Sequence, residues 1–195
     1  MKLKNLTPFL ALIILAATSC KKETSEPDDS PISGNWKLSS IASNSISTAT
    51  LTQAGYELKF ENTSTFASTT TKGIYKISST SFTGEGIGYE YTGTTSVKQY
   101  ENDVLESEVT NPLNGASPAS NGTSQINLIG NDSIYFQNIL FSGTANTPGG
   151  CKYKLEGDKL SLFINQSSTT TTNVGGGIIS TEKSNVTMTV VLQKQ

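Results

Sequence analysis

The chain alternates apolar and charged side chains over residues 56–61, whose sequence is YELKFE. In an extended segment Tyr56, Leu58 and Phe60 fall on one face, and the charged residues between them fall on the other. This alternation predicts an antiparallel strand with one buried face and one solvated face. The stretch decides the fold class because the same period of two recurs along the rest of the chain.

The alternation returns over residues 87–91, 151–155, 160–164 and 186–192, with Ile87, Tyr89 and Tyr91 sharing one face of the first of these. Turn residues at 130–132 and 156–159 separate neighbouring segments and predict two tight hairpins. No segment of the expected mature chain shows a sustained helical period. The sequence therefore predicts an all-β domain, a single antiparallel up-and-down barrel of eight to ten strands over residues 32–195, with a β-sandwich as the alternative.

The composition excludes much chemistry. The 195 residues include 26 Ser and 27 Thr, 14 Lys, no His and, since those 14 are all the basic residues, no Arg. Without His there is no Ser-His-Asp triad and no His-ligated metal, and without Arg there is no guanidinium clamp for phosphate. The net charge of −2 also argues against nucleic acid as a partner. No cofactor is expected, and the protein is not expected to be an enzyme.

The first nineteen residues have the features of an export signal. Two lysines precede an apolar run at residues 9–17, which is too short to span a bilayer and has the length of a signal-peptide core. The run is followed by Thr18, Ser19 and Cys20, and a small residue before Cys resembles the cleavage site of bacterial lipoproteins. This resemblance implies that Cys20 becomes the new N-terminus and carries acyl chains such as palmitate; the alternative is an ordinary secretory peptide.

Residues 20–31 are polar, charged and interrupted by Pro27 and Pro31, so they predict a flexible tether. The charged residues directly after Cys20 resemble lipoproteins of the Bacteroidota. That resemblance implies anchoring to the outer membrane through the lipid on Cys20, on the periplasmic side or at the surface. The expected organisation is a signal peptide at 1–19, a tether at 20–31 and a barrel at 32–195.

The single tryptophan stands at the start of the ordered domain, in the sequence Gly34-Asn35-Trp36. A Gly-x-Trp motif followed by meandering strands resembles the lipocalin-like domains of exported bacterial lipoproteins. The resemblance implies that Trp36 closes one barrel end and that Gly34 leaves room for close backbone packing there. Lipocalins commonly place an Arg of the last strand over this Trp; here Lys183 or Lys194 would have to serve.

Two features of the sequence are candidates for reactive sites. Glu101, Asp103, Glu106 and Glu108 form the densest carboxylate cluster, and a solvated strand face explains it more simply than paired catalytic carboxylates do. Cys151 alternates with Tyr153 and Leu155, which predicts a buried and inert thiol. No catalytic residue and no metal ligand is expected.

The expected function is non-covalent binding of a small apolar or amphipathic ligand inside the barrel. The candidates for lining the cavity are Tyr56, Leu58, Phe60, Ile87, Tyr89 and Tyr91. The alternative is an interaction module that binds glycan or a partner protein through its strand faces. Residues 111–125 and 165–177 are rich in Pro, Gly, Ser or Thr and predict two long irregular loops. The sequence leaves the oligomeric state open.

Overall fold

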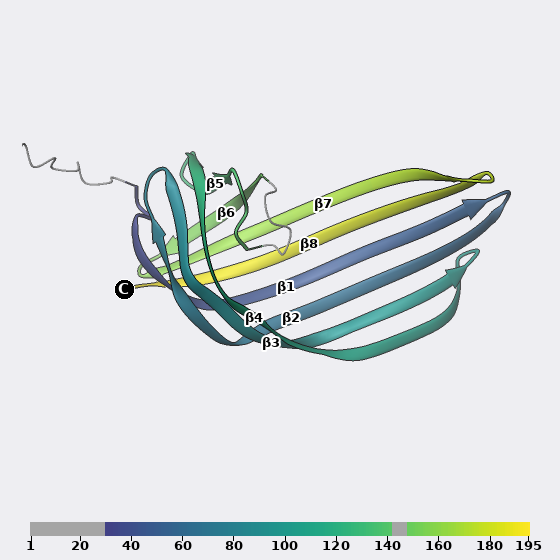
Figure 1. Cartoon of the computed structure of the whole chain (residues 1–195), viewed down its shortest axis with the longest axis horizontal. Helices are drawn as coiled ribbons and strands as arrows, with labels where there is room; N and C mark the ends of the chain where they lie inside the picture. The colour runs from purple at the N-terminus through teal and green to yellow at the C-terminus, as the bar shows by residue number, and fades with distance from the viewer. Residues whose placement is uncertain (1–29, 142–147) are drawn as a thin grey trace, which may run out of the picture.

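The computed structural model describes residues 30–141 and 148–195, and this part of the chain consists of strands and short connections (Figure 1). The strands are unusually long, up to 26 residues, except for two short ones. In chain order they are β1 (Gly34–Gln53), β2 (Tyr56–Ile77), β3 (Ser81–Glu101), β4 (Val104–Ile129), β5 (Ser133–Phe136), β6 (Gly149–Glu156), β7 (Lys159–Gly175) and β8 (Ile178–Lys194).

The sheet is a closed up-and-down barrel in which each strand pairs antiparallel with the next and β1 pairs with β8. The predicted single antiparallel barrel is thereby confirmed, and the sandwich alternative is not adopted. Both predicted hairpins are also present, because Ile129 pairs with Ser133 and Glu156 pairs with Lys159. A third tight turn joins β3 to β4 at Asn102 and Asp103, whose positive φ angles of 48° and 65° suit these two residue types.

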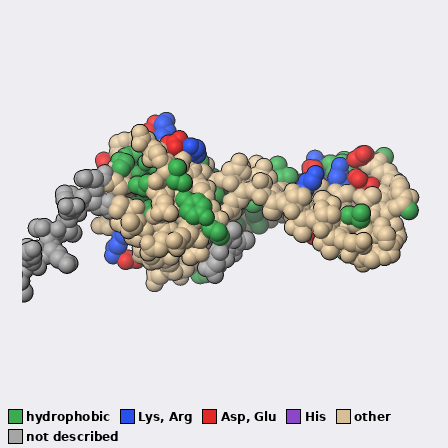
Figure 2. Space-filling model, turned by 90° about the horizontal axis from the view of Figure 1, so that it is seen from above, with side chains coloured by type: hydrophobic (Ala, Val, Ile, Leu, Met, Phe, Trp, Pro, Cys, Tyr) green, Lys and Arg blue, Asp and Glu red, His purple; other side chains and the backbone are tan. Residues whose placement is uncertain are grey.

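The ring of eight strands closes over only part of the strand length, because β5 and β6 are short. The pairing of β6 with β7 ends at Ile164, and β4 pairs with β5 only over residues 126–129. Beyond that level six strands continue as an open sheet in the order β4-β3-β2-β1-β8-β7 (Figure 1). We call this part the extension: residues 44–53, 56–65, 94–101, 104–112, 165–175 and 178–187. Figure 2 shows the barrel and the tip of the extension as two lobes joined by a narrower middle.

Large side chains fill the closed part of the barrel. Tyr75, Phe82, Phe136 and Phe141 form a ring cluster with centroids 4.9 to 6.0 Å apart, and all four are buried. Phe141 lies in the segment that follows β5, which docks on β4 through hydrogen bonds from the backbone of residues 137 and 138. That segment continues the interior packing past the end of β5.

The two predicted irregular loops are strands, so that prediction is wrong. Residues 111–125 lie within β4 and pair with β3, and residues 165–175 lie within β7 and pair with β8; only 176–177 form a turn. Ser and Thr are compatible with extended backbone, and Thr is a good strand former. Pro112 and Pro118 fit because β4 is an edge strand there, where a missing N–H removes no ladder hydrogen bond.

Candidate functional site

Trp36 lies at the barrel end opposite the extension, where β1 begins. The indole is fully buried, and its Nε1 donates a 2.8 Å hydrogen bond to the carbonyl oxygen of Ile32. The Nζ atom of Lys194 lies 5.6 Å from the ring centroid of Trp36, so Lys194 takes the place expected for a basic residue of the last strand. Lys183 instead lies far along β8 in the extension, opposite Thr48.

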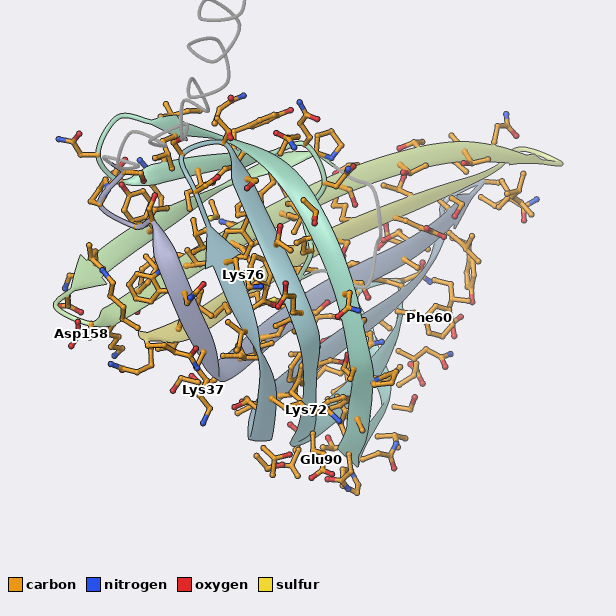
Figure 3. All side chains as sticks on the ribbon, turned by 60° about the vertical axis from the view of Figure 1, so that its left-hand side comes forward. Lys37, Phe60, Lys72, Lys76, Glu90 and Asp158 are labelled. Carbon is orange, nitrogen blue, oxygen red and sulfur yellow. The ribbon has the colours of Figure 1, made fainter. Side chains whose placement is uncertain are left out.

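The six candidates for lining a cavity fall into two groups. Tyr56, Leu58 and Phe60 lie on the extension, with Tyr56 at its tip and 43% exposed, and Figure 3 shows Phe60 away from the barrel. Ile87 and Tyr89 are partly buried and pack against the barrel core. Tyr91 follows on the same face of β3. The structure therefore does not bring all six together around one cavity.

An aromatic platform marks the boundary between the barrel and the extension. It consists of Phe66 from β2 and Tyr89 and Tyr91 from β3, with ring centroids 4.9 Å apart for Phe66 and Tyr91 and 6.3 Å apart for Phe66 and Tyr89. Phe66 is in register with Ser43 and, across β1, with the buried Met188. The platform therefore lies on the face that continues the barrel interior, which we call the inner face.

Local backbone geometry holds the platform in place. A side chain at Gly115 of β4 would run into the ring of Tyr91, so this ring lies directly over a glycine of the neighbouring strand. Burial raises the pKa of Tyr89, opposed by a hydrogen bond with Ser117, so the phenol is neutral at physiological pH. The platform thus offers aromatic rings that are only partly covered.

A polar cluster follows the platform along the same face. Ser64 and Thr95 share a 2.9 Å hydrogen bond between their hydroxyl groups, and Thr95 donates to the side-chain oxygen of Asn62 at 3.1 Å. Between Phe66 and Phe60 on β2, and between Gly93 and Gln99 on β3, every inner-face residue is uncharged. The inner face of β2 and β3 therefore combines aromatic rings with hydroxyl and amide groups.

The inner face of β1, β7 and β8 is also rich in hydroxyl groups. A shallow hollow of about 190 Å³ lies on β1, β7 and β8. Its lining residues are Ser47, Thr48, Ala49, Ser168, Thr170, Glu182, Lys183 and Ser184. Of these, Glu182 carries the one carboxylate.

The opposite, outer face of the extension carries most of its charge. Lys59 lies 4.4 Å from the ring centroid of Tyr100 and forms an ion pair of 3.3 Å with Asp103, and Lys98 pairs with Glu108 at 3.7 Å. Two members of the acidic cluster are therefore paired with lysines, and all four of its residues are exposed. This arrangement fits the interpretation of the cluster as a solvated face.

Cys151 is a free and buried thiol of β6, as its alternation predicted. Burial raises its pKa from the ordinary 9.0 to about 12, so the reactive thiolate is scarce at physiological pH. The described residues contain no group of three or more His, Cys, Asp or Glu side chains placed to hold a metal ion.

Sequence reasoning missed Phe66, the ring that completes the platform. Phe66 is the lone aromatic residue in a run of Ser, Thr and Ala, and only the register with β3 places it beside Tyr91. The predicted lipidation site Cys20 and the signal peptide lie outside the described residues. Within the described ranges, no helix has the length and apolar character needed to cross a bilayer.

Comparison with known proteins identifies no relative. No family model matches the chain, and neither curated proteins nor solved structures match it.

Proposed function

We propose that this protein is a lipid-anchored interaction module of the cell envelope that binds glycan chains on the inner face of its extension. The observation that carries the proposal is the division of the molecule into a filled barrel and an open sheet. Tyr75, Phe82 and Phe136 occupy the space that a ligand inside the barrel would need. The extension, in contrast, presents an uncovered face among the described residues.

The chemistry of the inner face suits a carbohydrate. A sugar ring has apolar C–H faces and a rim of hydroxyl groups, so it stacks on aromatic rings while its hydroxyls exchange hydrogen bonds. The platform of Phe66, Tyr89 and Tyr91 supplies the rings. The cluster of Asn62, Ser64 and Thr95 supplies donors and acceptors two to four residues along the strands from Phe66 and Tyr91, about 7 to 13 Å away. The uncharged stretch from Phe66 to Phe60 on β2 and from Gly93 to Gln99 on β3 fits a neutral polymer.

Anchoring rests on the sequence. An acylated Cys20 followed by a tether at residues 20–31 would hold the barrel at a membrane, with residue 30 entering at the end opposite the extension (Figure 1). This arrangement would point the extension away from the lipid and toward envelope polysaccharides. A membrane through the anchor and a glycan through the inner face are therefore the proposed partners.

The test is binding of the purified full-length chain to envelope polysaccharides, measured by affinity electrophoresis. Y91A removes a platform ring and should weaken binding about fivefold, since stacking on one ring contributes on the order of 1 kcal/mol. The matched control is Y100A, which removes the same side chain from the outer face of the same strand and should leave binding unchanged. Y91F keeps the ring over Gly115 and should bind nearly as the parent does.

Equal binding by Y91A and Y100A would refute the glycan site. A barrel that binds a small apolar ligand is the competing outcome: an apolar fluorescent probe would then bind at one site, with an affinity that the substitution N62A on the extension does not change.

A further inference from the structure

The free edge of β7 carries backbone N–H and C=O groups that no described strand pairs with. Residues 165–175 pair with β8 on one side, and no described strand pairs with them on the other. In an antiparallel edge strand every second residue points its N–H and C=O groups outward. Eleven residues therefore present about 36 Å of backbone that can accept another strand.

The opposite edge of the extension, on β4, is built differently. It contains Pro112, which lacks an N–H, and the exposed carboxylates Glu106 and Glu108, and Pro118 follows on the same free edge toward the barrel. Prolines and charges are the devices by which natural edge strands avoid pairing with other chains. The β7 edge has neither: its sequence from residue 165 is NQSSTTTTNVG, without charge and without proline.

We propose that the β7 edge is a homodimer interface, in which two copies of this chain pair antiparallel along residues 165–175. The edge is compatible with itself because two uncharged copies place no like charges opposite each other. The paired side chains are hydroxyl and amide groups, and Thr opposite Thr or Ser is a favourable cross-strand pair. The two extensions then form one continuous sheet with β7 and its copy at the centre, and the protected β4 edges lie at its two ends.

The internal segment 142–147 has too few residues to cover this edge. The segment that precedes β6 between described residues, 142–147, has six residues and spans about 20 Å at full extension. The edge is longer than that, so its distal half stays available to a second copy. A pairing centred on Thr170 sets Thr169 opposite Thr171 of the second copy, with both side chains on the outer face and away from the proposed glycan site.

The test uses two double variants that differ at one position. T169E/T171E sets carboxylates opposite carboxylates across the interface, whereas T169E/T171K sets carboxylates opposite ammonium groups. Thr169 is in register with Lys183, so the shared T169E meets the same neighbour in both variants. Sedimentation of the full-length chain in detergent, over a range of concentrations, gives the dimer dissociation constant.

We expect the parent and T169E/T171K to dimerise, and T169E/T171E to dimerise about tenfold more weakly or not at all. A control pair of double variants with the same charges at Thr110 and Asn114, which are exposed on the outer face of β4, should show no difference in dimerisation. Oxidation of T170C should give a disulfide-linked dimer under non-reducing conditions. A parent that stays monomeric at all concentrations would overturn the proposal, as would a dimer whose two double variants associate equally.

Discussion

Lys194 and Trp36 are register partners across the seam that closes the barrel, and the Nζ atom of Lys194 lies 5.6 Å from the centroid of the indole ring. The backbone N–H of Lys194 also donates to the carbonyl oxygen of Asp158 in the β6–β7 turn, at 2.8 Å. The last strand is thereby fastened both to the first strand and to a hairpin at the same barrel end.

This contact predicts a measurable role for Lys194. K194A should lower the free energy of unfolding by about 0.5 to 1 kcal/mol, the size of a cation–π contact at an exposed site. K194R should match or exceed the parent, because a planar guanidinium stacks on an indole. The measurement is thermal or urea unfolding followed by Trp36 fluorescence. K183A is the matched control on the extension; a loss of stability equal to that of K194A would contradict the assignment.

Gly93 is predicted to be intolerant of any side chain. It lies on β3 between β2 and β4, and an added Cβ would overlap the carbonyl oxygen of Thr65. G93A should therefore lower the free energy of unfolding by about 2 to 3 kcal/mol, since the backbone itself must move. In the control G150A the nearest atom, the carbonyl oxygen of Ile134, is 3.6 Å away, so unfolding should change little. Equal effects in urea titrations would count against this local packing.

Cys151 should react slowly with thiol reagents in the native protein and quickly after denaturation. Burial raises its pKa to about 12, so the native chain holds far less thiolate than the unfolded chain at both pH 7 and pH 9, and it should label more slowly at both. The folded-state pKa exceeds the ordinary 9.0, so this group's contribution to stability is complete below about pH 9 and is lost toward pH 12. Rapid native labelling at pH 7 would show that the thiol is accessible.

Cys20 is predicted to carry the lipid anchor. C20A should move the protein from the membrane fraction to the soluble fraction, and intact mass of the parent should show a chain that starts at Cys20 with added acyl mass. C151A is the control and should stay in the membrane fraction. Mature protein that begins elsewhere and lacks acyl mass would identify an ordinary secretory signal instead.

The sequence was sufficient to predict the fold class. It did not predict every strand of the extension, which lies beyond the apolar core. Alternation reveals a strand only if one of its faces is apolar, as in residues 151–155 and 188–192, whose apolar side chains line the filled barrel. In residues 165–175 both faces are solvated, so selection for apolar side chains is absent and the segment reads as a polar loop. Its strand conformation comes from pairing with β8, which no local pattern records.

The same alternation predicted part of the candidate site: it showed which residues share a face, but not where along the strands the barrel ends. Alternation correctly predicted that Tyr89 and Tyr91 share a face and that Leu58 and Phe60 share a face. It does not tell how far along a strand the barrel ends, because a period of two is the same inside the closed ring and beyond it. The position of that boundary depends on the shortness of β5 and β6, whose lengths are a property of the whole sheet.

The pairing of β1 with β8 also constrains the order of events when the chain folds. Hairpins such as β7–β8 join neighbours in sequence and can form early, whereas the seam needs the two ends of the domain to meet. Until β8 pairs with β1, the backbone edge of β1, which is rich in Ser and Thr, stays unpaired. A chain whose N-terminal strands form first therefore keeps two unpaired edges until its last strand joins, and unpaired edges are the places where wrong strands can pair.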